Sequence, residues 1–298
     1  MIYILFLSND LNCYYFSQKS TDYETIEFNI SNSLLNRLYY YLLRHNIIDI
    51  PIIYKKETAV DKLTKVDFDV EKDVIVVWGI HRIEMLNNIC KYLPKKLKKY
   101  YWIWNTLPSD YQYCRQRLDK VASLGFEIAT FDRGDASLYH LILKPQVFKY
   151  FELNTQICIK YDFYFLGLSK NRNDIISKLR QQLVDFKCKF IIPDSPQNVI
   201  SYEENLQMIA SSKCIIDIVK PEQQGLTLRP LEALFYKKKL ITTYKAIKDY
   251  DFYTKENIFI LGVDDMKNLR SFIESPVVEV RNSVKQQFNF DYWIKSFK

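Results

Sequence analysis

The sequence predicts two α/β domains, each a doubly wound, Rossmann-like parallel sheet, that face each other across a cleft. Apolar runs of strand length alternate with longer segments of helical periodicity throughout the chain, which is typical of parallel sheets covered by helices. The length of 298 residues suits two domains of about 150 residues each. The alternation breaks at Pro145, so we expect one domain over residues 1–150 and another over 151–298.

The first half is expected to supply one parallel sheet. Its predicted strands are Met1–Leu7, Ile50–Tyr54, Val74–Trp78, Tyr101–Asn105 and Phe126–Phe131. Its predicted helices are Leu34–Arg44, Arg82–Leu93 and Asp110–Leu124. The spacing of these elements favours strand–helix–strand crossovers, which make neighbouring strands parallel.

The second half repeats the pattern. Its predicted strands are Phe163–Gly167, Lys187–Ile192, Cys214–Val219, Lys239–Thr243 and Asn257–Leu261. Its predicted helices are Asn171–Phe186, Tyr202–Ser211, Leu228–Tyr236 and Asp264–Glu274. The last stretch, Val280–Phe297, is amphipathic and aromatic, and we expect it to form a closing helix that packs back on the first domain.

Composition excludes several classes of protein. Hydrophobic residues make up 48% of the chain, which argues against disorder, and the net charge of +7 is mild for this length. The cysteines are scattered without a CxxC pair, so neither a zinc site nor a disulfide framework is expected; they are Cys13, Cys90, Cys114, Cys158, Cys188 and Cys214. The opening MIYILFLSND lacks the features of a signal peptide, and no apolar run reaches the ~20 residues of a membrane helix. We therefore expect a cytoplasmic protein.

Ligands of doubly wound sheets bind beyond the carboxyl ends of the strands. The sequence thus predicts functional residues in the loops that follow Leu7, Trp78, Asn105 and Phe131 in the first half, and Leu166, Ile218 and Thr243 in the second.

The segment 211–262 carries the clearest candidate site. A buried strand runs into a polar loop with Gly225 and Leu226, and a helix follows with Thr227 as its expected N-cap. Backbone N–H groups at such a helix start suit a diphosphate, and Arg229 can add a planar fork for phosphate oxygens. Glu232, one turn into the helix, could accept hydrogen bonds from ribose hydroxyls. Arg229 and Glu232 could equally be an ordinary i,i+3 surface pair.

A further candidate loop opens the second half. In FLGLSKNRNDII, Gly167, Ser169, Lys170 and Arg172 lie between a strand and a helix. The loop has too few glycines for a P-loop or a dinucleotide fingerprint. Two cations beside a helix start nevertheless suit a pyrophosphate leaving group, whereas the alternative is a solvated loop of ordinary positive charge.

The run QQGLTLRPLEAL, followed by KKKLITT and DFYTKENIFIL, resembles the donor-binding half of GT-B glycosyltransferases, and in particular bacterial lipopolysaccharide and capsule transferases. In the first half, TFDRGDASLYHL (130–141) is similar to the same group. The resemblance implies a nucleotide-sugar donor, by default a UDP-sugar, in the second domain and a glycan or lipid-linked glycan acceptor in the first. It implies Glu232 for the ribose, and Gly225, Leu226, Thr227 and Arg229 for the diphosphate. The chain departs from the retaining E-x7-E pattern, because neither Lys239 nor Leu240, seven and eight residues after Glu232, is an acid.

An inverting sugar transfer needs a general base for the acceptor hydroxyl and a positive group for the departing diphosphate. Asp132, directly after a strand, is our first candidate base, and His81 is the second. Asp132 could instead cap the next helix, and a lone histidine could be structural. The acidic groups SND (8–10), DRGD (132–135) and DD (264–265) do not have a convincing metal arrangement. We therefore expect no metal cofactor.

KYLPKKLKKYYW (91–102) places lysines among aromatic and apolar residues: Lys91, Lys95, Lys96, Lys98 and Lys99. Such a surface suits an anionic membrane, where a lipid-linked acceptor would be found, although a solvated helix end is an equal interpretation. The cluster is short and the remaining charges are mixed, so we expect no nucleic-acid partner.

The sequence leaves two other functions open. One is a catalytically inactive GT-B-like protein that binds a nucleotide or glycan as a partner subunit. The other is a different two-domain α/β enzyme, such as a sugar-nucleotide epimerase. A fold by itself does not choose between them.

Overall fold

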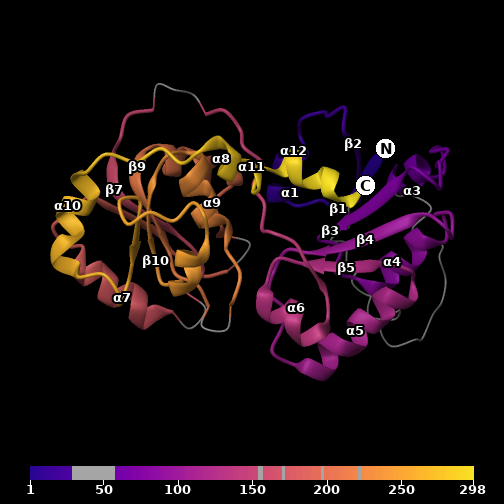
Figure 1. The fold of residues 1–298 in the computed structure, drawn as a ribbon, viewed down its shortest axis with the longest axis horizontal. Coiled ribbons are helices and arrows are strands. Elements are labelled where there is room, and N and C mark those ends of the chain that lie inside the picture. Colours follow the sequence, from indigo (N-terminus) through magenta and orange to yellow (C-terminus); the bar gives the residue numbers. More distant parts are fainter. Residues whose placement is uncertain (29–57, 154–156, 170–171, 196–197, 221–222) are drawn as a thin grey trace. The chain divides into compact units, whose positions relative to one another are not determined.

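The computed structural model describes residues 1–28, 58–153, 157–169, 172–195, 198–220 and 223–298 (Figure 1). The chain divides into two compact units: residues 1–144 together with Ile294–Lys298, and residues Pro145–Trp293. Each unit is built on one sheet whose paired strands are all parallel. The predicted class, two Rossmann-like α/β sheets, is confirmed.

The sheet of the first unit has the spatial order β2 (Tyr23–Phe28), β1 (Ile2–Leu7), β3 (Val74–Trp78), β4 (Lys98–Ile103), β5 (Glu127–Thr130) and β6 (Ile142–Leu143). The strand order changes direction between β1 and β3. In open α/β sheets this switch point leaves a crevice at the carboxyl ends of the strands. The loops after Leu7 and Trp78 therefore lie where a ligand of this unit is expected.

The helices of the first unit are α1 (Asp10–Tyr15), α3 (Thr58–Leu63), α4 (Ile83–Cys90), α5 (Tyr111–Ser123) and α6 (Arg133–Tyr139). Side-chain caps fix where several of them begin. Asn9 accepts the N–H of Asn12 at the start of α1, and Asp110 accepts the N–H of Tyr113 at the start of α5. Each cap satisfies a backbone donor that the helix cannot satisfy by itself.

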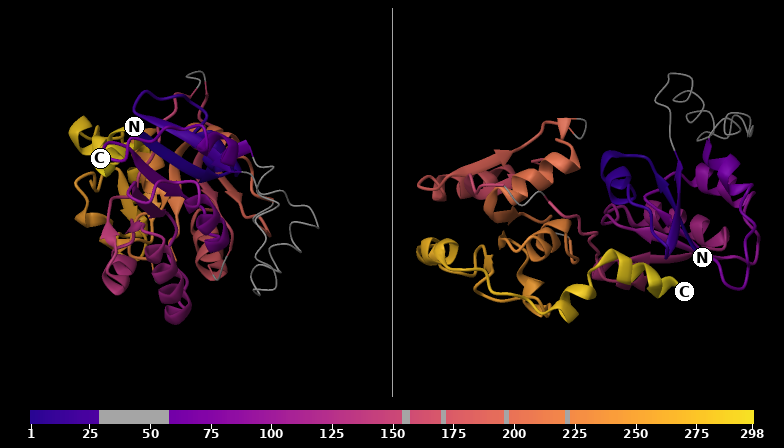
Figure 2. Two further views of the ribbon diagram at one scale, coloured as in Figure 1. Left: turned by 90° about the vertical axis from the view of Figure 1, so that its right-hand side faces the viewer. Right: turned by 90° about the horizontal axis from the view of Figure 1, so that it is seen from above.

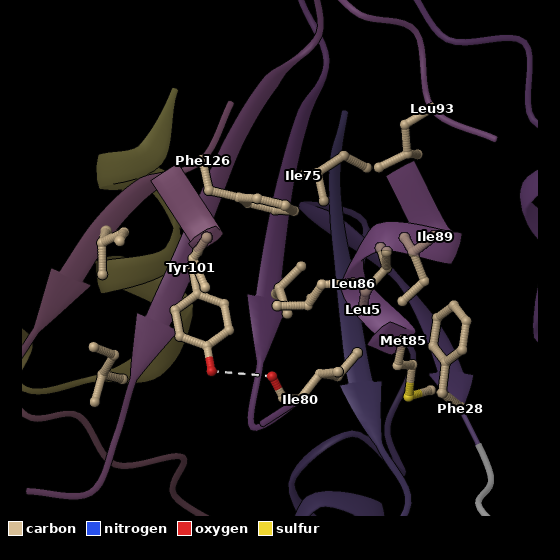
Figure 3. Packing of buried hydrophobic residues seen from close by; sticks show 14 of the residues in the cluster. Leu5, Phe28, Ile75, Ile80, Met85, Leu86, Ile89, Leu93, Tyr101 and Phe126 are labelled. Carbon is tan, nitrogen blue, oxygen red and sulfur yellow. Dashed lines mark hydrogen bonds between the residues drawn. The ribbon is translucent and has the colours of Figure 1, made fainter. Parts of the chain in front are cut away.

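Helix α4 packs its buried face in the core of the first unit (Figure 3). Its buried residues Met85, Leu86 and Ile89 recur at helical spacing and pack in the same cluster as Leu5 and Ile75 of the sheet. Strand β3 is buried along its whole length because both faces of a parallel sheet are covered. This explains why its sequence, VIVVW, is apolar without alternation.

The sheet of the second unit has the order β11 (Ile258–Ile260), β10 (Lys239–Thr242), β9 (Ser212–Asp217), β7 (Tyr161–Leu166) and β8 (Cys188–Ile191). All of these strands agree with the sequence prediction to within two residues. The order changes direction between β7 and β9. The switch point therefore lies between the strands that end at Leu166 and Asp217.

The helical segments of the second unit are α7 (Asn173–Gln182), α8 (Tyr202–Ala210), α9 (Leu228–Phe235), η3 (Lys245–Asp249), η4 (Met266–Asn268), α10 (Leu269–Glu274), α11 (Asn282–Gln286) and α12 (Phe290–Trp293). Helix α8 starts with a reciprocal capping box, in which Ser201 and Glu204 each bind the other's backbone N–H. The core of this unit includes Phe163, Phe165 and Ile216 from the sheet, packed in one cluster with residues of α7 and α10.

The predicted single helix over Val280–Phe297 is wrong. The segment forms α11, α12 and the short helix η5 (Ile294–Phe297). Asn289 interrupts it, because its side chain accepts the N–H groups of Asp291 and Tyr292 and starts a new helix. Figure 2 shows both chain ends within the first unit, where the ring of Phe297 packs at 4.8 Å from that of Tyr100.

Other differences from the prediction concern short elements. Elements β2, α1, α3, α6 and β6 were not predicted, because each is brief and lacks a clear period. Strand β4 begins at Lys98 rather than Tyr101, since its pairing with β3 reaches Val74 opposite Lys98.

The predicted strand Ile50–Tyr54 and helix Leu34–Arg44 lie outside the described residues. No helix in the described ranges has the length and apolarity to cross a membrane.

Replacing Leu86 by alanine tests the packing of α4. The side chain is fully buried, so its loss leaves a cavity and we expect the first unit to lose about 2–5 kcal/mol of unfolding free energy. Urea unfolding followed by tryptophan fluorescence measures the change. The control is Leu138→Ala on α6, which is 54% exposed and should change stability by less than about 0.5 kcal/mol. Equal effects of both variants would contradict the described core.

Candidate functional site

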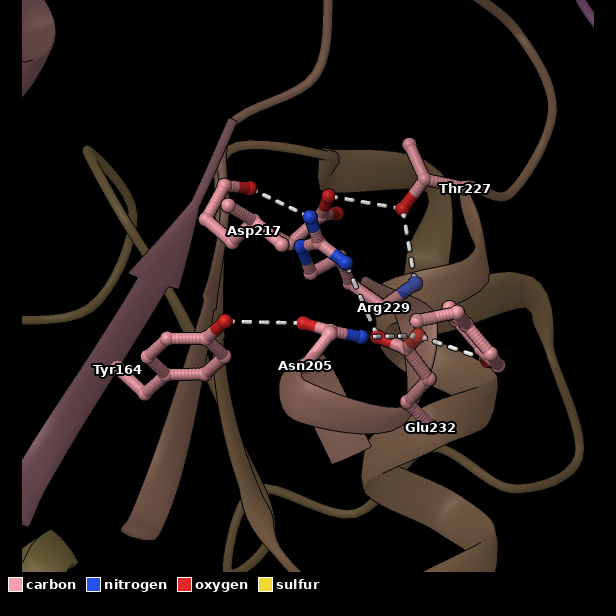
Figure 4. A network of polar contacts seen from close by, with 8 residues as sticks. Tyr164, Asn205, Asp217, Thr227, Arg229 and Glu232 are labelled. Carbon is pink, nitrogen blue, oxygen red and sulfur yellow. Dashed lines mark hydrogen bonds and ion pairs between the residues drawn. The ribbon is translucent and has the colours of Figure 1, made fainter. Parts of the chain in front are cut away.

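The switch point of the second sheet brings the predicted donor residues Thr227, Arg229 and Glu232 together in one polar network (Figure 4). Arginines from α9 and from the loop before α7 both donate to main-chain carbonyls at the carboxyl ends of β7 and β9. Asp217 ends β9, and Thr227 and Glu232 belong to the start of α9. This is the edge at which doubly wound sheets bind ligands.

Arg229 is held from two sides. One of its guanidinium nitrogens donates to Glu232 Oε2 at 3.1 Å, and the other donates to the carbonyl oxygen of Leu166. The side chain is 20% exposed. Burial lowers the pKa of Arg229, but the nearby Glu232, Tyr164 and Asp217 outweigh it, so the net shift is upward. The guanidinium is therefore charged and fixed in orientation.

Glu232 lies at the centre of a buried network. It is fully buried, and its Oε1 accepts hydrogen bonds from the Tyr202 hydroxyl at 3.1 Å and from Asn205 Nδ2 at 3.2 Å. Asn205 Oδ1 in turn accepts from the Tyr164 hydroxyl. Both carboxylate oxygens of Glu232 thus bind protein donors, and a ribose could reach Oε1 only by replacing Tyr202 or Asn205. The ribose role of Glu232 stays a prediction.

Asp217 is a residue of this site that the sequence reasoning missed. It is 2% exposed and accepts the hydroxyl of Thr227 at 2.8 Å and that of Thr242 at 2.9 Å. Burial raises its pKa, although the threonine hydroxyls, Arg229 and Arg172 oppose the shift. The available signal was a carboxylate at the end of the apolar run KCIIDIV, where a buried strand meets a functional loop.

Thr227 joins Asp217 to the helix. As the N-cap of α9 it accepts the N–H of Arg229 at 3.2 Å while donating its hydroxyl to Asp217. The predicted helix start at Thr227 is therefore confirmed. Gly225 and Leu226, which precede it, are buried.

Arg172 forms hydrogen bonds with main-chain carbonyls of the described residues. Its guanidinium donates to the carbonyls of Ile218, Leu168 and Ser169. A Cβ atom on Gly167 would stand 3.5 Å from Arg172 Nη2 and 3.2 Å from the ring of Phe165, so a glycine leaves room for the guanidinium. Burial, with a smaller effect of Arg229, lowers the pKa of Arg172, while Asp217 opposes this. Lys170 lies outside the described residues.

In the first unit, Asp132 is the N-cap of α6. Its Oδ1 accepts the N–H groups of Gly134 and Asp135 at 2.9 and 3.1 Å, and the residue is buried. The capping interpretation is therefore observed, and a catalytic role stays a prediction. Neighbouring Asp135 accepts the N–H of Leu107, and its pKa is raised by burial and by Asp132.

His81 follows β3 at the switch point of the first sheet, after Gly79, which has a φ of +71°. The residue is exposed. Partial desolvation, together with the positive charge of Arg117, lowers the pKa of His81. This shift favours the neutral imidazole, the form that a general base requires.

The lysines of residues 91–99 do not form one surface. Lys91, Lys95, Lys96 and Lys98 are exposed, but Lys99 is buried and its ammonium packs over the ring of Phe126 at 5.7 Å. Lys99 was therefore wrongly included in the predicted basic patch, because alternate residues of a strand face opposite sides. Among the described residues, no group of three His, Cys, Asp or Glu side chains is placed to hold a metal ion.

Comparison with known proteins shows the fold. No protein-family model and no curated protein matches the sequence. An α-glucosyltransferase in complex with UDP and a 13-mer DNA containing a central A:G mismatch matches over 100% of this chain and 93% of its own, with a TM-score of 0.50 and 11% identity. The fold is GT-B. The α-glucosyltransferase complex with UDP-glucose and DNA containing an abasic site has a TM-score of 0.48 and 10% identity over the same shares.

The raised pKa of Asp217 predicts a pH-dependent stability. The folded chain holds the Asp217 proton more tightly than the unfolded chain. Its contribution is therefore most favourable at low pH and declines as the pH rises above about 3.9, the ordinary pKa of an aspartate. We expect Asp217→Asn to gain stability relative to the wild type as the pH rises from about 4 to about 6.

Urea unfolding at a series of pH values measures this difference. Asp185→Asn, at an exposed position after α7, is the matched control and should run parallel to the wild type. If Asp217→Asn instead loses stability relative to the wild type as the pH rises, Asp217 has a lower pKa in the folded chain than in the unfolded chain.

Proposed function

We propose that the chain is a glycosyltransferase that uses a nucleotide-sugar donor bound by the second unit. The observation that carries this proposal is the position of the Arg172 and Arg229 guanidinium groups at the carboxyl ends of β7 and β9. A cation fixed on carbonyl oxygens keeps its orientation before a ligand arrives, which lowers the entropic cost of binding. The GT-B fold agrees with this chemistry without proving it.

The donor diphosphate would bind across the two arginines and the start of α9. Arg229 and Arg172 offer planar forks, and Gly225, Leu226 and Thr227 bring main-chain N–H groups to the helix start. Gly167 and Ser169 lie in the same loop as Arg172, and Lys170 stays a predicted contact of the diphosphate. A nucleoside diphosphate sugar, by default a UDP-sugar, has the charge that these groups fit. Glu232 would take the ribose by exchanging the Tyr202 hydrogen bond for a ribose hydroxyl.

The first unit would bind the acceptor, a glycan or lipid-linked glycan of a bacterial lipopolysaccharide or capsule. A base removes the proton of the acceptor hydroxyl, whose oxygen attacks the anomeric carbon as the bond to the diphosphate breaks. We keep Asp132 as the first candidate base and His81 as the second. The arginines and the helix start would stabilise the charge on the leaving diphosphate, so the proposed reaction needs no metal.

The exposed lysines Lys91, Lys95, Lys96 and Lys98 would bring the chain to an anionic membrane at the cytoplasmic face, where such an acceptor is found. We propose no nucleic-acid partner. The DNA in the similar structures is a ligand of those α-glucosyltransferases, and we do not extend it to this chain.

A second candidate function is a catalytically inactive relative that binds a nucleotide or glycan as a partner protein. The complete engagement of the Glu232 carboxylate by Arg229, Tyr202 and Asn205 favours it. A structural carboxylate of this kind would support the fold without contacting a ribose.

Nucleotide binding is the first test. A ligand at 100 times its dissociation constant stabilises the folded state by about 2.7 kcal/mol. We expect UDP to raise the melting temperature of the wild type, and Arg172→Gln to weaken binding at least tenfold, by about 1.4 kcal/mol or more. A panel with GDP, ADP, CMP and dTDP identifies the base. Arg270→Gln, whose side chain is 59% exposed, is the control and should bind like the wild type.

The outcomes separate the candidates. If no nucleotide shifts the melting temperature at millimolar concentration, the transferase proposal fails. If the wild type and Glu232→Ala bind UDP equally well, Glu232 has a structural role and the ribose assignment is wrong.

Turnover tests the base. With a UDP-sugar and an acceptor, we expect Asp132→Asn to lower the rate of nucleotide release by about 10²–10⁴-fold while leaving UDP binding unchanged. Asparagine is also a good N-cap, so α6 should persist. His81→Gln is compared in the same assay. If only His81→Gln lowers the rate, Asp132 is a cap and the histidine is the base.

A further inference from the structure

The amino edge of the second sheet carries a row of lysines. Each of four neighbouring strands has a lysine within two residues of its start: Lys238 before β10, Lys213 in β9, Lys160 before β7 and Lys187 before β8. These strands are adjacent in the order β10-β9-β7-β8. The lysines are far apart in the sequence, so only the sheet brings them together.

The strand register keeps Lys238, Lys213 and Lys187 at one level and places Lys160 two residues further toward the amino end of β7. Lys239 pairs with Cys214, which sets Lys238 beside Lys213, and Tyr161 pairs with Ser212. Phe163 pairs with Cys188 on the other side of β7. Because neighbouring strands lie about 4.8 Å apart, the row extends over roughly 15 Å.

Two of these lysines, Lys213 and Lys238, form contacts within the second unit. Lys213 pairs with Asp162 at 2.8 Å, and the Lys238 ammonium donates to the carbonyl of Ala210, the last residue of α8. A lysine at a helix carboxyl terminus satisfies a free carbonyl and complements the helix dipole.

The lysines before β7 and β8 form no such contact among the described residues. The side chains of Lys160 and Lys187 are exposed, and in the described part of the chain neither ammonium forms an ion pair. Asp162 already pairs with Lys213, and Glu274, which lies beside Lys213 and Lys238, pairs with Arg270. The four lysines of the row therefore outnumber these two carboxylates.

Exposed aliphatic side chains lie among the lysines. Ile159, which precedes Lys160, is 50% exposed, and Val184, near Lys187, is 77% exposed. Ile159 and Val277 also line a surface groove together with Lys213 and Lys238. None of the groove's lining residues is aromatic or an arginine.

We propose that this lysine row and its aliphatic residues bind the surface of an anionic lipid bilayer. Lysines can lay their aliphatic stems on the surface and extend their ammonium groups to lipid phosphates, while the aliphatic side chains enter the interfacial layer. Single-stranded nucleic acid is disfavoured, since its binding sites stack bases on aromatic rings. The inference concerns residues other than Lys91–Lys98 and does not depend on glycosyl transfer.

The test is co-sedimentation of the full chain with phosphatidylcholine vesicles that contain about 30 mol% phosphatidylserine. We expect binding that weakens as salt is raised and that is absent with phosphatidylcholine alone. Each lysine near such a surface contributes about fivefold in affinity, so Lys160→Gln with Lys187→Gln should weaken binding about 25-fold. Both positions are exposed, so the variant should fold normally.

A matched control removes the same charge elsewhere in the unit. Lys248→Gln with Lys267→Gln, both exposed and on η3 and η4, should bind vesicles as the wild type does. Ile159→Ser should weaken binding a few-fold even at a salt concentration that screens the lysines.

Several results would overturn the proposal. One is that the wild type does not bind the vesicles or binds single-stranded DNA more tightly. Another is that the Lys160/Lys187 variant binds the vesicles as well as the wild type does, or loses no more binding than the Lys248/Lys267 control. A Lys95→Gln with Lys96→Gln variant that alone abolishes binding would assign the membrane contact to the first unit. Nucleotide binding is scored separately: Arg172→Gln should keep vesicle binding whether or not UDP binds.

Discussion

The buried ion pair of Arg229 and Glu232 organises the second unit. It ties the first turn of α9 to the carboxyl end of β7, through the carbonyl of Leu166, and to α8, through Tyr202 and Asn205. A buried pair of this kind adds little net stability, but removing one partner leaves a buried charge and costs about 3–5 kcal/mol. Its main effect is therefore to fix geometry at the switch point, where a ligand is expected.

Positive and negative side chains lie close together at this switch point. Asp217 and Glu232 supply negative charge beside Arg172 and Arg229, and burial makes each of these charges more costly in isolation. Arg229 forms an ion pair with Glu232, whereas Arg172 forms none with the described residues, so Arg172 is the less compensated of the two cations. The negative charge of a diphosphate would compensate the positive charge of Arg172.

One topological rule locates the donor residues of the second unit and His81 of the first, whereas Asp132 follows β5, away from the reversal. In each sheet the order reverses next to the first strand, and polar residues follow the strands that flank the reversal. The loops after Leu166, Ile218 and Trp78 could be predicted because apolar runs locate strand ends in the sequence. The partners of Glu232 could not, because Asn205 and Tyr202 belong to another helix and a single sequence does not show which helix faces Glu232.

By itself the sequence determined the alternation of strands and helices, the parallel sheets and the start of α9 at Thr227, because periodicity and capping are local properties. Tertiary structure alone decided the short elements β2 and β6 and the burial of Lys99. It also decided that Glu232 is enclosed by protein donors and that lysines from four strands form one row. These features depend on contacts between residues distant in the chain, which no local pattern of residues encodes.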